Sequence, residues 1–254
     1  MSEIPSGRTA ELHDRVAIVT GAARNIGRAI ALELAAAGAA VIVNSRSTKS
    51  ELEEVVGEIE TNGGKAMAFL ADVTDARAVA GMVEAALQRY GRLDILVNNA
   101  AVRREMPFEQ MALAEWREIL GVVLDGAFIC AQASTPALAE SGGGTIINIG
   151  GLTGHTGAHR RAHVITAKAG IVGFTKALAY DLAAKNITVN CVSPGLIDTK
   201  RAGSTPAHHA EHKTIVGRLG QPSDVAAAVR MLCGPGGRYI TGQTIHVNGG
   251  VFMA

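Results

Sequence analysis

Residues 20–30 read TGAARNIGRAI and join an apolar run, VAIVT (16–20), to a stretch with apolar residues three and four apart. A β-branched run followed by glycine and then by helical periodicity predicts a strand, a tight turn and a helix. Gly21 permits the turn, and Gly27 lets the helix pack closely on the strand. Such a turn presents backbone N–H groups at a helix N-terminus, where a phosphate group is stabilised. The stretch predicts a phosphate-binding loop, and the lack of a following Gly-Lys-Ser/Thr excludes a Walker-type loop.

The same alternation of short apolar runs and helical stretches continues along the chain. The runs are almost continuous in Val, Ile and Leu, as expected of strands that are buried on both faces. This pattern predicts an α/β fold: a single doubly wound Rossmann domain over residues 1–254, with a seven-stranded parallel sheet and helices on both faces. Residues 198–218 lack clear periodicity, and we expect a substrate lid there. The predicted strands are 16–20, 40–44, 66–70, 93–97, 144–149, 187–192 and 243–247.

Composition narrows the class of protein. The chain has 254 residues, 48% of them hydrophobic, and 24 Lys and Arg against 23 Asp and Glu, so its net charge is +1. That balance predicts neither a nucleic-acid nor a membrane partner. The three cysteines form no CxxC pair, and residues 1–12 are polar without the apolar core of a signal peptide. We expect a cytoplasmic protein.

Several further motifs share one family pattern. After the loop Thr20-Gly21-…-Gly27 come ADV (71–73), NNAA (98–101), PGLIDT (194–199) and a C-terminal YITGQTIHVNGG (239–250). Together these resemble the short-chain dehydrogenase/reductase family, in particular its members of the 3-oxoacyl-ACP-reductase type, over nearly the whole chain. Asn25 stands where the family has a glycine, and Asn is among the few residues that tolerate positive φ.

The resemblance implies a dinucleotide cofactor and, for many members, a homo-oligomer, here a dimer or tetramer. In the family pattern Asp72 meets the adenine amino group and Thr199 the nicotinamide carboxamide. The cofactor residues implied in this way are Gly21, Arg24, Asn25, Ile26, Gly27, Ser45, Arg46, Asp72, Val73, Asn99, Ala100, Ala101, Lys168, Pro194, Gly195, Ile197 and Thr199.

Two arginines indicate which dinucleotide binds. An acidic residue after the second strand would accept the ribose hydroxyls of NAD. The sequence has VNSRS (43–47) there, with Arg46 just past the strand and Arg24 inside the glycine loop. A guanidinium can pair with a 2′-phosphate, which a carboxylate would repel. NADP(H) is therefore predicted, the alternative being that both arginines are solvated surface charges.

The catalytic centre departs from the family. The family's tetrad uses tyrosine as proton donor, lysine to lower its pKa, serine to position the substrate oxygen and asparagine to order a water relay. Lys168 matches the lysine, but Val164, Gly151 and Val123 stand at the tyrosine, serine and asparagine positions. General acid–base catalysis contributes about 10²–10⁴-fold, so redox chemistry here needs a substitute acid or a substrate that requires none.

Nearby histidines and arginines are the candidate substitutes. His155, His159 and His163 lie between the serine and tyrosine positions, and His155, in the loop that follows Gly151, is the best placed proton donor. Arg161, Val164 and Lys168 are spaced to share one helical stripe. Further cations near this opening are Arg103, Arg104, Lys200 and Arg201.

These cations predict an anionic substrate, a carboxylate or phosphate, unless they are merely exposed loop charges. His208 and His212 have a spacing that can bind zinc, but a zinc site needs further ligands held by a rigid part of the fold, so no metal is predicted. The leading hypothesis is an NADP(H)-dependent oxidoreductase acting on a small anionic carbonyl or hydroxyl compound. Lys168, Arg161 and His155 are its catalytic candidates, with a histidine, an arginine or water assisting the proton transfer. The alternatives are a non-redox lyase or hydrolase that stabilises an enolate or oxyanion in the basic cleft, and an NADP(H)-binding pseudoenzyme.

Overall fold

Seven parallel strands form one sheet in the order β3-β2-β1-β4-β5-β6-β7. The computed structural model describes residues 10–199 and 213–254. The predicted fold class is confirmed, and the strand bounds differ from the predicted ones by at most two residues at either end. The strands are β1 (Val16–Val19), β2 (Ala40–Ser45), β3 (Lys65–Leu70), β4 (Ile95–Asn98), β5 (Gly144–Ile149), β6 (Ile187–Pro194) and β7 (Thr244–Val247).

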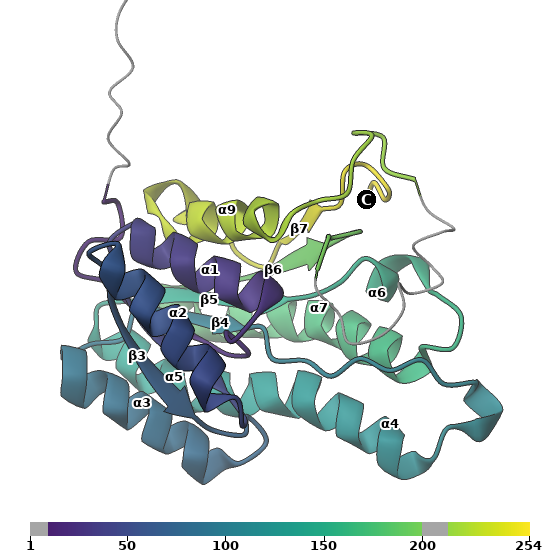
Figure 1. The fold of residues 1–254 in the computed structure, drawn as a ribbon, viewed down its shortest axis with the longest axis horizontal. Coiled ribbons are helices and arrows are strands. Elements are labelled where there is room, and N and C mark those ends of the chain that lie inside the picture. Colours follow the sequence, from purple (N-terminus) through teal and green to yellow (C-terminus); the bar gives the residue numbers. More distant parts are fainter. Residues whose placement is uncertain (1–9, 200–212) are drawn as a thin grey trace, which may run out of the picture.

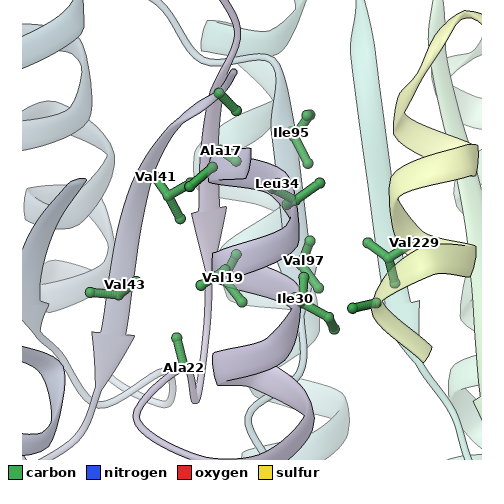
Figure 2. Packing of buried hydrophobic residues seen from close by; sticks show 14 of the residues in the cluster. Ala17, Val19, Ala22, Ile30, Leu34, Val41, Val43, Ile95, Val97 and Val229 are labelled. Atoms are coloured by element: carbon green, nitrogen blue, oxygen red, sulfur yellow. The ribbon is translucent and has the colours of Figure 1, made fainter. Parts of the chain in front are cut away.

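Alternate residues of each strand supply two separate cores. Along β1, Ala17 and Val19 belong to one core, whereas Val16 and Ile18 belong to the other. Both sets are buried because the side chains of a strand alternate between the two faces of the sheet. Figure 2 shows the first core, where these strand residues meet Ile30 and Leu34 of one helix and Val229 of another.

Helices cover both faces, as Figure 1 shows. On the face of the first core lie α1 (Asn25–Ala36), α2 (Lys49–Thr61) and α9 (Pro222–Cys233). On the other lie α3 (Ala76–Tyr90), α5 (Gly126–Glu140) and α7 (Ala162–Leu182). Within the described residues there are also α4 (Leu113–Leu120), the single turn α6 (Thr153–Thr156), and short 3₁₀ turns at Phe108–Gln110, Ala183–Lys185 and Pro235–Gly237.

A π-helical turn, Gly121–Asp125, joins α4 to α5. By length and composition alone, the resulting helix Leu113–Glu140 could cross a membrane. Its buried residues Cys130, Ala131 and Leu138 instead pack in the second core with residues of the sheet and of α3. Helical periodicity does not reveal the π turn, and such turns are frequent at functional sites.

The sheet order locates the binding edge. From β1 the chain first builds outward through β2 and β3, then returns to build outward through β4 on the other side. The loops after β1 and β4 therefore diverge, and a crevice opens at the carboxyl ends of these strands.

Candidate active site

A cleft of about 800 Å³ opens at this edge of the sheet. Ligand pockets commonly have volumes of about 300–1,000 Å³. Every residue predicted to bind the cofactor lines the cleft, and so does Arg161. The sequence did not point to Thr48, Glu105, Val122 and Leu152, which also line it. Motifs that lie far apart in the sequence thus converge on one site.

The glycine loop is shaped by backbone geometry that side chains would obstruct. Gly21 has φ +62°, and a Cβ on Gly27 would lie 2.2 Å from the Gly21 carbonyl oxygen. Asn25, at the first position of α1, has φ +52°. The loop therefore keeps the left-handed geometry despite the asparagine, and it brings the N-terminus of a twelve-residue helix to the cleft, where an anion is stabilised.

A hydrogen-bonded tie holds this loop against the loop after β4. The Thr20 hydroxyl accepts the backbone N–H groups of Asn99 (2.9 Å) and Ala100 (3.1 Å). The Asn99 side-chain amide donates to the carbonyl oxygens of Thr20 and Gly21 at 2.9 and 3.0 Å. We predicted Asn99 as a cofactor residue, and the structure shows that its amide stabilises the glycine loop.

The two arginines expected at a 2′-phosphate both have acidic neighbours. Arg24 forms an ion pair with Glu51 of α2 at 3.1 Å, and Arg46 lies 4.0 Å from Asp72. Ser45 accepts hydrogen bonds from the backbone and the hydroxyl of Thr48, ordering the turn between them. Both arginine side chains are more than half exposed. Exposed pairs of this kind are weak, so an incoming phosphate can compete for the arginines.

Asp72 is fixed by its own turn. Its carboxylate accepts the backbone N–H and the hydroxyl of Thr74 at 2.9 and 2.7 Å. The backbone hydrogen bond from Thr74, with the charge of Arg46, holds the Asp72 pKa below its ordinary value. The carboxylate stays ionised at neutral pH at the rim of the cleft.

Lys168 is the buried titratable group of the cleft. Its side chain is 7% exposed, and Nζ donates to the carbonyl oxygen of Ile149, at the end of β5, at 2.6 Å. Burial lowers the Lys168 pKa to about 7, and the positive charges of Arg103 and Arg161 act in the same direction. This amine can therefore exchange a proton near neutral pH.

The positions expected to carry the other catalytic groups present no polar side chain. Val164 is 2% exposed and lines the cleft beside Gly151. Val123 lies in the π turn and packs with Ile119 and Ile171 in a third core. A Cβ built on Gly151 would meet only the Lys168 Cγ, at 3.8 Å, so there is open space next to the lysine stem.

The expected helical stripe of Arg161, Val164 and Lys168 does not form, although all three residues line the cleft. Helix α7 begins at Ala162, and Arg161 is its N-cap with a non-helical backbone (φ −135°, ψ 27°), so the three residues do not share one helical stripe. Arg161 nevertheless lines the cleft and is 7% exposed. Arg104 forms ion pairs with Glu118 and Glu115, which reduces the positive charge at the mouth. Lys200, Arg201 and most of the expected lid lie outside the described residues.

The structure separates the histidines from the cleft. His155 does not line the cleft, whereas Thr153 does. The two residues are two positions apart on the single helical turn α6, so their side chains leave the helix about 200° apart. Its ring packs on His246 and Phe252, with centroids 4.6 and 5.5 Å away, and burial and His246 lower its pKa. His159 is exposed, and His163 is buried, its Nδ1 accepting the Val164 N–H.

A buried polar chain supports the floor of the site. Asn98 donates to Asn148 at 2.9 Å, and Asn148 donates to the hydroxyl of Thr175 at 3.0 Å. Sequence reasoning missed this chain, because an asparagine inside an apolar strand gives no indication of its partner. Within residues 10–199 and 213–254, no group of three His, Cys, Asp or Glu residues is placed to hold a metal ion. His208 and His212 lie outside these ranges.

Known proteins share this fold and much of this sequence. The family model described as enoyl-(acyl carrier protein) reductase matches residues 21–252. A 3-oxoacyl-[acyl-carrier-protein] reductase of Synechocystis is 40% identical over 240 residues, covering 94% of this chain and 97% of the relative. The chain belongs to the short-chain dehydrogenase/reductase family of oxidoreductases.

Two solved structures are closely similar. One is a short chain dehydrogenase from Burkholderia cenocepacia J2315 in complex with NADP, 34% identical, with a TM-score of 0.89 over 95% of this chain and 99% of that chain. The other is a dehydrogenase/reductase from Sinorhizobium meliloti 1021, also 34% identical, with a TM-score of 0.90 over 97% of this chain and 98% of that chain.

Proposed function

We propose that this chain is an NADP(H)-dependent oxidoreductase for small anionic carbonyl or hydroxyl compounds, with Lys168 as its proton donor. One observation carries the proposal: a single cleft runs from the glycine loop to a buried lysine whose pKa is about 7. The family model and the relatives are named for different acyl groups, so we take the substrate class from the cleft itself.

The residues present fit a dinucleotide phosphate. A side chain at Gly27 would collide with the Gly21 carbonyl oxygen, so only glycine allows this close approach. The turn at Gly21 leads into the N-terminus of α1, which can bind a phosphate. Arg24 of the glycine loop and Arg46, just past β2, both line the cleft, and a 2′-phosphate would lie at the turn after β2. A relative crystallised with NADP supports this choice.

The bound nicotinamide would supply or accept the hydride, and residues of this chain donate or accept the proton. Protonated Nζ of Lys168 donates a proton to the oxygen that gains charge, and the resulting amine keeps its hydrogen bond to Ile149. The sequence left the proton donor open among several groups. The position of His155 outside the cleft favours the lysine.

The anion preference rests on Arg161 and Arg103. Both line the cleft, and the charges of both act on Lys168. A carboxylate or phosphate bound between them would place an adjacent carbonyl group near Nζ, and charge-assisted pairing with a guanidinium is strong in a partly buried site.

The cellular and assembly proposals follow the same family pattern. We propose a cytoplasmic, homo-oligomeric protein with one domain, a lid at about 198–218, and no nucleic-acid or membrane partner. Phe128 of α5 and Tyr180 of α7 are 49% and 89% exposed, which supports a contact between copies on this side of the sheet.

The test is nicotinamide turnover with a panel of 2-oxo acids and phosphorylated ketones. We expect NADPH oxidation at saturating NADPH to fall at least tenfold in Lys168→Gln and to stay unchanged in Lys176→Gln, an exposed lysine of the same helix. Because the protonated amine is the acid, the reduction rate should fall as the pH rises through about 7. NADPH binding without turnover across the panel would contradict the proposal and favour a pseudoenzyme.

A further inference from the structure

Lys168 is 7% exposed, and it lines the cleft. Val164 and Gly151 line the cleft beside it and offer no polar side chain, and the space at Gly151 adjoins the lysine stem. Among the residues that the structure describes, Nζ makes one hydrogen bond, to the Ile149 carbonyl oxygen. A neutral amine held by one N–H retains its lone pair, which a small carbonyl compound in the cleft can reach.

Burial and the positive charges that face Lys168 both favour the neutral form of this amine. Arg103, in the loop after β4, and Arg161, at the start of α7, are both cations. Cys191 of β6 faces it too, but burial raises the pKa of that thiol to about 11, so it carries no charge near pH 7. Asp72 and Glu105 also line the cleft, but the charges that lower the Lys168 pKa are those of the two arginines.

These features match the requirements of an amine nucleophile. Desolvation and a neighbouring cation are the two devices that activate lysines for attack on carbonyl groups. With a pKa of about 7, roughly half of the Lys168 side chains are neutral at pH 7. An exposed lysine is neutral about a thousandfold less often at that pH. The same arginines that repel the ammonium form attract a carboxylate.

We propose that Lys168 forms an imine with small aldehydes or ketones that carry a carboxylate. The Nζ lone pair forms a bond to the carbonyl carbon, the carbon–oxygen π bond breaks, and a proton moves from nitrogen to oxygen. Loss of water, with the second N–H proton, then gives the carbon–nitrogen double bond. The step needs no oxidant, reductant or nucleotide, so it goes beyond the proposed oxidoreductase function and does not depend on it.

Reductive trapping tests the proposal on the full chain without added nucleotide. The protein is incubated with pyruvate and sodium cyanoborohydride at pH 7, and modified lysines are located by peptide mass mapping. We expect carboxyethylation of Lys168 at least tenfold above that of Lys176, its exposed control on the same helix. Lys168→Arg should remove the site-specific product and leave the background on other lysines.

Two further comparisons separate imine formation from ordinary surface labelling. Acetone, which lacks the carboxylate, should label Lys168 at least tenfold more slowly than pyruvate does, and Arg161→Gln should narrow that difference. Labelling of Lys168 should level off above pH 8, whereas labelling of Lys176 should keep rising. Equal labelling of Lys168 and Lys176 at pH 7, or equal rates for acetone and pyruvate, would overturn the proposal. Nicotinamide turnover is measured separately, so either idea can fail alone.

Discussion

The hydroxyl of Thr20 accepts the backbone N–H of Asn99 at 2.9 Å, and the Asn99 side chain donates to the Thr20 carbonyl oxygen at the same distance. Thr20 directly follows β1, and Asn99 directly follows β4. These two hydrogen bonds therefore join the loops after β1 and β4, between which the order of strand addition reverses. The shape of the phosphate loop therefore depends on a residue almost eighty positions away.

Thr20→Val should lower both stability and nucleotide affinity. The change leaves the N–H groups of Asn99 and Ala100 without their acceptor, and such a loss costs about 1–3 kcal/mol. Urea unfolding and NADPH titration calorimetry measure the two effects. Thr135→Val is the control, because that hydroxyl donates only to a carbonyl of its own helix. Equal losses in the two variants would show that the tie has no special role.

Arg46 should decide between the two dinucleotides. We expect Arg46→Asp to weaken NADPH binding about 10- to 100-fold relative to NADH, because a charge-assisted hydrogen bond to a phosphate contributes about 1.5–3 kcal/mol. Glu51→Gln should act in the opposite direction by releasing Arg24 from its ion pair. Calorimetric titration with both cofactors provides the measurement. Arg28→Gln, in an ion pair with Glu58 outside the cleft, should change neither affinity.

Asn25→Gly should tighten nucleotide binding. Asn25 has φ +52°, which glycine adopts without a steric penalty, and removing the side chain opens the loop to the phosphates. Asn186→Gly is a matched control, since Asn186 has φ +56° at the end of a 3₁₀ turn away from the cleft. Both variants should change stability by less than about 1 kcal/mol. If Asn186→Gly improved binding as well, the effect could not be assigned to the phosphate loop.

The sheet and the cofactor cleft were predictable because they depend on local patterns. Short runs of Val and Ile, as in 40–44, fix a strand, and the loops at the carboxyl ends of parallel strands must meet. The position of His155 was not predictable, because it depends on a single turn of helix whose direction is set by contacts with His246 and Phe252. The expected stripe of Arg161 likewise depended on where α7 begins, and helix starts are poorly defined by periodicity.

Lys168→Met should stabilise the protein in a pH-dependent way. The folded pKa of about 7 lies below the ordinary 10.5, so between these values the unfolded chain binds more protons and the stability that depends on Lys168 rises with pH. Removing the amine should therefore raise the unfolding free energy most at pH 7, by up to about 4 kcal/mol, and by only about 1 kcal/mol at pH 9.5. Urea unfolding at the two pH values gives the difference. Lys176→Met should show no such pH dependence.

Restoring the family's side chains tests whether the cleft still has reductase geometry. In the triple variant Val123→Asn, Gly151→Ser, Val164→Tyr, the serine Cβ meets only the Lys168 Cγ at 3.8 Å, so this added carbon fits without repacking. The tyrosine lies four residues before Lys168 on a helix and lines the cleft, where nearby positive charge favours the phenolate. The asparagine replaces a side chain that is 4% exposed within an apolar core, so some loss of stability is expected.

The triple variant should reduce activated ketones with NADPH faster than the parent, by about 10²-fold where acid catalysis is limiting. Thr166→Tyr places the same phenol on the exposed side of α7 and should give no gain. Adding Lys168→Met to the triple variant should abolish the gain, because the phenol then loses the cation that lowers its pKa. A folded triple variant that binds NADPH but gains no activity would show that the backbone around Val164 and Gly151 no longer holds a carbonyl group in reach of the nicotinamide. The imine chemistry of Lys168 would then be the better account of why the lysine is retained.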